Sequence, residues 1–218
     1  MSDEDCEKDL VRCRDRGAPA ALTCLDQIRK RQKILDIEEE VKAVHESIES
    51  KQRPFRDHPD IQKFQKQFDP STYGVQARFK MLVLIGDTQQ GKTSKAMSLW
   101  GSRKTLKLQC GNCPAGALPS LGSFDRGVHK ALVFDEIRVE QVMLFRELFQ
   151  ANQHIQTLGT SACNPYAYCV WVYHTAMILC ANSFDVEDEN LSLADRKWLK
   201  GNTIIVQLPE GEVWFETS

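Results

Sequence analysis

One short segment carries residue types and a spacing that can bind phosphate groups. Residues 86–93 read Gly-Asp-Thr-Gln-Gln-Gly-Lys-Thr and directly follow an apolar run at 81–85. They match the pattern G-x-x-x-x-G-K-S/T, whose glycines let successive backbone N–H groups form a nest for anions. Lys92 would reach the β- and γ-phosphates of ATP, and the Thr93 hydroxyl would hold Mg²⁺. We therefore predict an ATP-binding loop formed by Gly86, Asp87, Thr88, Gln89, Gln90, Gly91, Lys92, Thr93 and Ser94.

A second apolar run, residues 131–134, ends in the two carboxylates Asp135 and Glu136. In phosphate-loop folds the strand that carries such a pair often lies beside the loop strand, so we expect that arrangement here. Asp135 would then face the Mg²⁺ ion and its waters, and Glu136 would accept a proton from the attacking water or orient it. Kinases of this fold commonly lack the second acid because they must exclude water. The pair therefore favours hydrolysis over phosphate transfer to a small acceptor.

Two further polar residues are candidates for a role in catalysis. Asn182 ends the apolar run 177–181, where its amide can bond both the γ-phosphate and the attacking water. The alternative is a simple turn after a strand. Arg196 can be offered to the nucleotide of a neighbouring subunit, where it would stabilise charge in the transition state. For Arg196 the alternative is an ordinary surface salt bridge.

The elements that must position these residues follow from the apolar pattern. From about residue 78 the pattern alternates between strand and helix, which predicts an α/β fold with a mainly parallel sheet. A short helix is expected around 60–68, and a hairpin is expected where Val213-Trp214-Phe215 follows the last strand. The predicted strands are 79–85, 104–109, 130–135, 176–181 and 202–208.

The first part of the chain has a different character. Residues 19–50 are expected to be helical, and five apolar residues, spaced three and four apart, give them an a/d pattern over two heptads. This helix would either lie on its own domain or form a self-associating collar. We therefore expect an N-terminal helical segment at 1–54 and an ATPase domain at 55–218. The five residues are Ile34, Ile37, Val41, Val44 and Ile48.

Composition limits the classes of protein that fit. The chain has 218 residues, 42% of them hydrophobic, and a formal net charge of −2. It therefore has no general electrostatic attraction to nucleic acid, and any such binding must be local. No apolar run approaches the ~20 residues of a membrane span. The acidic N-terminus has no secretory apolar stretch, so we expect the nucleus or cytoplasm and reduced cysteines. The pair Cys110 and Cys113 alone lacks the four ligands of a zinc site.

Three motifs at these spacings resemble superfamily 3 helicases, the AAA+-like ATPases of small DNA and RNA viruses. The chain is most similar to the C-terminal helicase domain of replication initiator (Rep) proteins of circular single-stranded DNA viruses, including geminiviruses. The resemblance implies ATP and Mg²⁺ as ligands, Asn182 as the sensor, and a homo-oligomeric ring that acts on single-stranded DNA or RNA in replication. The segments that carry it are 85–94, 133–137 and 179–182.

Two departures from that family leave part of the function open. No His-x-His pair of a nicking domain occurs, so we do not expect DNA cleavage. The family also places basic residues in a hairpin between the acidic strand and the Asn strand, whereas residues 147–195 contain neither Lys nor Arg. Without strand translocation, the ATPase would serve as a nucleotide-driven switch or assembly module. Aromatic residues in this stretch would either stack on bases or face the core: Tyr166, Tyr168, Trp171 and Tyr173.

Overall fold

The computed structural model describes residues 54–114, 116–159 and 167–216, and part of the stretch 33–51. The chain divides into two compact units, Met1–Gln52 and Arg53–Ser218. In the first unit the described residues are helical. Ile34 and the predicted helix before residue 33 lie outside the described residues. About half of each remaining heptad side chain is exposed, namely Ile37, Val41, Val44 and Ile48. Self-association through this helix stays a prediction.

The second unit is an α/β fold built on a five-stranded sheet. Its order is β2-β3-β6-β1-β7, and every neighbouring pair is parallel. All five strands lie where the sequence pattern predicts them. Four of the segments are short, largely apolar runs, whereas residues 105–109 alternate between apolar and polar side chains. The strands are β1 (Met81–Ile85), β2 (Thr105–Gln109), β3 (Ala131–Asp135), β6 (Ala176–Ala181) and β7 (Thr203–Gln207).

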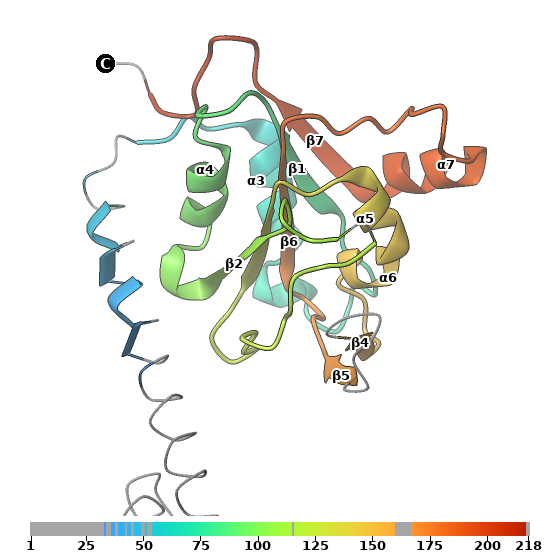
Figure 1. Cartoon of the computed structure of the whole chain (residues 1–218), viewed down its shortest axis with the longest axis horizontal. Helices are drawn as coiled ribbons and strands as arrows, with labels where there is room; N and C mark the ends of the chain where they lie inside the picture. Colours follow the sequence, from blue (N-terminus) through green and yellow to red (C-terminus); the bar gives the residue numbers. More distant parts are fainter. Residues whose placement is uncertain are drawn as a thin grey trace, which may run out of the picture. The chain divides into compact units, whose positions relative to one another are not determined.

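Helices cover both faces of this sheet, which explains why its central strands are buried throughout. The helices α3 (Pro59–Lys66) and α4 (Lys92–Ser98) lie on one face, where Ile61, Phe64 and Ala96 are buried (Figure 1). The other face is covered by α5 (Val139–Leu144), α6 (Arg146–Phe149) and α7 (Leu193–Asn202). The predicted helix at 60–68 is thus confirmed as α3, and a short 3₁₀ turn, η1 (Pro70–Thr72), follows it.

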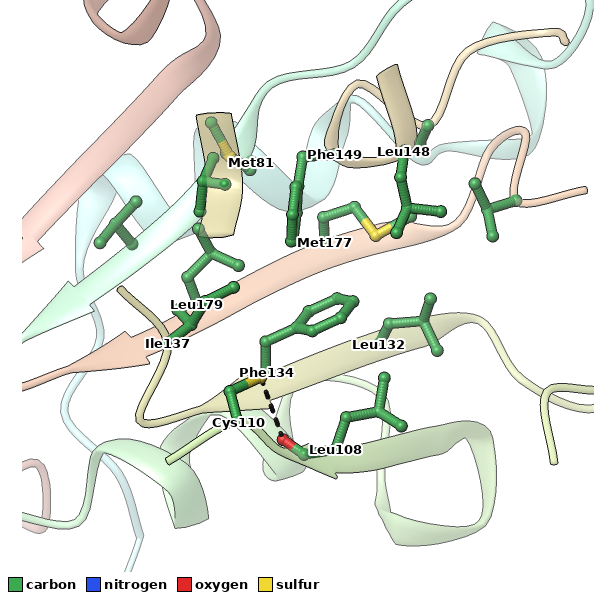
Figure 2. Close-up of a cluster of buried hydrophobic side chains, with 14 of the residues drawn as sticks. Met81, Leu108, Cys110, Leu132, Phe134, Ile137, Leu148, Phe149, Met177 and Leu179 are labelled. Atoms are coloured by element: carbon green, nitrogen blue, oxygen red, sulfur yellow. Dashed lines mark hydrogen bonds between the residues drawn. The ribbon is translucent and has the colours of Figure 1, made fainter. Parts of the chain in front are cut away.

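The core on the α5–α7 face is densely aromatic and aliphatic. Figure 2 shows Phe134 of β3 and Leu179 of β6 in the same layer as Phe149 of α6. The rings of Phe134 and Phe149 meet edge to face, with centroids 4.9 Å apart. This packing fixes the central strands, and hence the positions of the polar residues that follow them.

The strand order corrects one expectation about the acidic strand. β3 does not lie beside β1, because β6 is inserted between them and pairs with both. The sequence pattern of a strand does not encode which strand will be its neighbour. Because all the strands are parallel, Ile85, Ala181 and Asp135 still end at the same edge of the sheet. Asn182 therefore follows the strand that separates the loop from the acids.

The C-terminal segment does not form the predicted hairpin. Phe215 instead makes an antiparallel bridge with Phe55, at the beginning of the second unit. The Arg56 N–H donates to the Trp214 carbonyl at 2.9 Å. The Trp214 side chain is 1% exposed and packs into the cluster under α3 and α4. Burial of this large ring accounts for the long-range pairing, which a local turn pattern does not encode.

A separate antiparallel pair, β4 (Gln156–Gly159) and β5 (Ala167–Val170), lies between α6 and β6 in the chain. Tyr173 is buried, and Tyr168 packs against the core, so the core-facing alternative holds for these two rings. Trp171 is 37% exposed, and Tyr166 lies outside the described residues. Within the described part of the chain, no helix is long and apolar enough to cross a bilayer.

Candidate functional site

A cavity of about 380 Å³ opens at the edge of the sheet where β1, β3 and β6 end. This volume falls in the range of small-molecule sites. The cavity brings together most of the residues that the sequence singles out, although they come from the ends of β3 and β6 and from the loop that follows β1. Its lining consists of Thr88, Gln89, Gly91, Lys92, Thr93, Ser94, Asp135, Glu136, Cys180, Ala181, Asn182 and Phe215.

Lys92 lines this cavity and is only 8% exposed. Its Nζ donates to the Gly86 carbonyl at 2.7 Å, the Asp87 carbonyl at 2.6 Å and Asn182 Oδ1 at 3.1 Å. All three acceptors are uncharged. Among the described residues, no carboxylate forms an ion pair with this ammonium group, so its charge remains available to an anionic ligand.

Burial lowers the pKa of Lys92 below its ordinary value, while the acidic groups around it, Asp135 among them, act in the opposite direction. The cause is the loss of hydration, which penalises the charged form. An anion that entered the cavity would favour the charged form again. Lys92 is therefore suited to binding phosphate groups.

The loop before Lys92 has the conformation that its glycine and glutamine residues permit. Gly91 has φ +85° and precedes α4, and an added Cβ would lie 2.8 Å from the Phe215 ring. Gln90 is 5% exposed, and its Oε1 accepts from the Asp87 N–H at 2.8 Å. Six of the nine predicted loop residues line the cavity. The other three do not line it: the Gly86 and Asp87 carbonyls accept from Lys92 Nζ, and Gln90 accepts from the Asp87 N–H.

Thr93 and Asp135 provide oxygen atoms suited to Mg²⁺. The Thr93 hydroxyl donates to Asp135 Oδ1 at 2.9 Å, which brings α4 and β3 together across β6. The other carboxylate oxygen, Oδ2, pairs with Lys107 Nζ of β2 at 2.9 Å. Mg²⁺ commonly takes one or two protein oxygens and completes its shell with phosphate oxygens and water. The hydroxyl and carboxylate pair fits that requirement.

The described residues contain no group of three or more His, Cys, Asp or Glu side chains arranged around a metal. Cys110 and Cys113 are therefore not part of such a group among the described residues. Cys110 is buried, and burial raises the pKa of its thiol to about 12. A protonated, buried thiol is a poor metal ligand and a poor nucleophile.

Glu136 lines the cavity in an uncommon backbone conformation. Its φ is +57°, in the left-handed region that costs energy for a residue with a Cβ. The side chain is held from β2, because Gln109 Nε2 donates to Glu136 Oε2 at 2.6 Å. The residue is otherwise exposed, so its carboxylate can accept a proton from a water molecule in the cavity.

Asn182 bonds Lys92 and lines the cavity together with Cys180 of the same strand end. The Cys180 side chain is buried, and this burial raises the pKa of its thiol to about 12. The thiol is therefore neutral near pH 7 and adds no negative charge beside Lys92. The Asn182 side chain thus lies within the cavity lining and bonds the buried lysine.

Arg196 is the one predicted catalytic residue that the structure does not place at the cavity. It lies on α7 and is not among the lining residues. Its Nε is buried and has no hydrogen-bond partner within the described part of the chain. Its neighbour Asp195 is the residue that forms an ion pair, with Arg146. The position of Arg196 is compatible with action on another subunit's site and not on its own.

Sequence reasoning missed three residues that touch this site. Lys107 and Gln109 hold the two acids, and an alternating strand pattern with polar residues at 107 and 109 is the only signal for them. Phe215 reaches the cavity through its pairing with Phe55, for which the sequence gives no local signal.

Comparison with known proteins adds no relative: no protein-family model matches the chain, and no curated protein matches its sequence.

Proposed function

We propose that the chain is an ATP hydrolase of the P-loop, AAA+-like class, similar to superfamily 3 helicases. The observation that carries the proposal is the convergence of Lys92, Thr93, Asp135, Glu136 and Asn182 on one cavity. These residues belong to three segments that lie far apart in the chain, so their meeting at one sheet edge is independent support. Ligands of open α/β sheets characteristically bind at that edge.

The strand order also supports this class. β6 separates the loop strand from the acidic strand and delivers Asn182 between them. A triphosphate that lay along the loop with its γ-phosphate toward the acids would pass this amide. Asn182 would then exchange its bond with Lys92 for bonds to the γ-phosphate and the attacking water.

Each residue at the cavity has a chemical role in this proposal. Lys92 would turn from the loop carbonyls to the β- and γ-phosphate oxygens. Thr93 and Asp135 would hold Mg²⁺, which when bound neutralises charge on the phosphates. Glu136 would orient the attacking water and take its proton. Gln109 would fix the Glu136 carboxylate while that proton moves.

ATP turnover in three variants tests the proposal. Lys92→Ala should abolish phosphate release, because the buried cation at the phosphates is lost. Glu136→Gln should still bind ATP but release phosphate at least ~10²-fold more slowly, because the amide cannot accept the proton. Lys80→Ala, an exposed lysine on the surface, is the matched control and should turn over normally. Normal turnover in the Glu136→Gln variant would show that another group is the base.

Action on single-stranded DNA or RNA is the second part of the proposal, and the resemblance is its main support. The Trp171 ring, which is 37% exposed, is a candidate stacking surface, and the Tyr173 ring already stacks on it with centroids 6.0 Å apart. The Arg126 guanidinium lies 3.9 Å from the centre of the Trp171 ring, and its Nη2 also donates to the Tyr73 hydroxyl at 2.9 Å. An exposed ring beside a guanidinium can stack on a base.

The alternative is a nucleotide-driven switch or assembly module that does not move along a strand. The stretch 147–195, which has no Lys or Arg, favours it because each missing phosphate contact removes salt-dependent affinity. ATPase and strand-displacement assays with DNA and RNA separate the two. Stimulated turnover with unwinding supports the helicase, and turnover unaffected by either nucleic acid supports the switch. Transfer of phosphate to a small acceptor instead of water would indicate a kinase.

A further inference from the structure

One wall of the cavity is aromatic, and the phosphate chemistry described above does not use it. The Phe215 side chain lines the cavity beside Gly91, Lys92 and Ser94. Its ring stacks on the Phe55 ring, with centroids 4.8 Å apart and an interplanar angle of 28°. Both side chains are half-buried, so part of the ring pair remains accessible. A phosphate chain has no use for such a surface, whereas a nucleobase does.

The ring pair is held firmly in place by the backbone. Phe55 and Phe215 face each other in an antiparallel bridge, and the N–H groups of Arg56 and Glu216 bond to the facing strand at 2.9 Å and 2.8 Å. A side-chain ion pair between Arg56 Nη1 and Glu212 at 2.6 Å joins the same two segments. The rings are therefore positioned before any ligand arrives, which lowers the entropy lost on binding.

The same segment is tied to the phosphate-binding loop. The Trp214 N–H donates to the Gln90 carbonyl at 3.0 Å, and the Phe215 ring lies against Gly91, the residue before Lys92. A larger residue than glycine at 91 would collide with that ring. The aromatic wall and the loop thus form one continuous surface.

Lys95, one turn after Lys92 on α4, contacts the segments that carry the two rings. It is 5% exposed, and its Nζ donates to the Arg56 carbonyl at 2.9 Å. The same ammonium lies 5.5 Å from the centre of the Phe55 ring and 5.8 Å from that of the Trp214 ring. These cation–π contacts link the helix that carries Lys92 and Thr93 to the ring pair.

From these contacts we propose that Phe215, backed by Phe55, is the platform on which the base of the nucleoside triphosphate stacks. The proposal rests on the proposed ATPase function, because it takes the phosphates to lie at Lys92. It assigns Phe215 as a binding residue and Phe55 as a positioning residue that acts through it. Because stacking uses the face of the base, the platform should serve ATP and GTP alike.

Calorimetric binding to the full chain with Mg²⁺ tests the platform. The ligands are a non-hydrolysable ATP analogue, the matching GTP analogue and inorganic tripolyphosphate, which has no base. Phe215→Ala should weaken both nucleotides about tenfold, or ~1.4 kcal/mol, and change tripolyphosphate affinity less than about twofold. Phe215→Tyr should restore nucleotide affinity, and Phe215→Leu, which keeps apolar bulk but has no ring, should not.

Two control variants separate the platform from the fold and from the ATPase proposal. Phe124→Ala removes another half-buried ring, stacked on His129 away from the cavity lining, and should leave all three affinities unchanged. Lys92→Ala should weaken all three ligands. If Lys92→Ala bound them all normally, the phosphate site itself would be wrong. If Lys92→Ala lost them but Phe215→Ala weakened none, or weakened tripolyphosphate as much as ATP, only the platform would be overturned.

Discussion

At the scale of single residues, Lys92 and Glu136 are both held in arrangements that cost energy: a buried ammonium group and a left-handed backbone. Lys92 is a buried cation bound to three uncharged oxygens. Glu136 has a left-handed backbone and a carboxylate fixed from the neighbouring strand β2. Such local costs are typical of residues kept for chemistry and not for stability.

The position of the Glu136 carboxylate can be tested without changing Glu136 itself. A Cβ at Gly111 would overlap Glu136 Oε2, so Gly111→Ala should push the carboxylate away while the flexible side chain spares the fold. We expect ATP turnover to fall about 10- to 100-fold with nucleotide affinity unchanged. Steady-state turnover and calorimetry on the same preparation measure the two quantities. Gly201→Ala on α7, where an added Cβ meets no atom within 4 Å and the backbone φ is not positive, controls for general glycine effects on stability.

Because of two buried thiols, we expect the free energy of unfolding to fall at alkaline pH. Burial raises the pKa of Cys110 and of Cys180 from 9.0 to about 12. The folded state therefore keeps protons that the unfolded chain has lost, so the free energy of unfolding is full below pH 9.0 and falls between pH 9.0 and about 12. Each thiol should contribute a slope of ~1.4 kcal/mol per pH unit in that range.

Denaturant unfolding at a series of pH values measures this slope. Cys110→Ala should reduce it, whereas Cys169→Ala, at an exposed position, should not. An equal slope in all three proteins would show that other groups cause the alkaline loss.

At the scale of elements, α3 stabilises the face of the sheet that also carries α4. Phe64 of α3 is fully buried and meets the Phe68 and Trp100 rings edge to face. Phe64→Ala should lower the free energy of unfolding by ~3–5 kcal/mol, because it removes these contacts and leaves a cavity. The neighbouring Lys63 is exposed, and Lys63→Ala should change the free energy of unfolding by less than ~0.5 kcal/mol. Equal effects of the two substitutions in denaturant unfolding would contradict this packing.

The positions of the strands in the sequence are largely predictable, whereas the order in which they pair in the sheet is not. The strands β1, β3 and β6 are compact apolar runs, so their positions in the sequence can be predicted from the apolar pattern. The insertion of β6 between β1 and β3 is decided by packing of the whole sheet, and no local pattern reports it. For the same reason the local pattern predicts a hairpin at Phe215, which instead pairs with Phe55.

The candidate site divides in the same way. The glycines, the lysine and the hydroxyl of the loop are predictable because one short segment holds them all. The contacts of Lys107 with Asp135 and of Gln109 with Glu136 depend on the register between β2 and β3, which brings Gln109 opposite Asp135. That register is fixed only when the sheet forms.

At the scale of the whole molecule, a catalytic role for Arg196 would require that subunits assemble. Arg196 does not line the cavity of its own chain, so in the proposed ATPase it would act on the nucleotide of a second subunit. We expect Arg196→Ala and Lys92→Ala each to be inactive alone. Mixed together they should recover part of the activity, because an intact loop then meets an intact arginine across an interface.

Turnover assays on mixtures at several ratios measure this recovery, and native mass measurement with and without ATP gives the number of subunits. Lys200→Ala, at an exposed position of the same helix, is the matched control and should be active alone. An active Arg196→Ala variant would remove this residue from the mechanism.

The most direct test of the proposed ATP site is an experimental structure of the Glu136→Gln variant with Mg²⁺ and ATP. We predict that the triphosphate lies along residues 86–94 and that the metal lies between Thr93 and Asp135. The Lys92 Nζ should have moved from the Gly86 and Asp87 carbonyls to the phosphates. A nucleotide bound anywhere else, with Lys92 still on its carbonyls, would contradict the proposal.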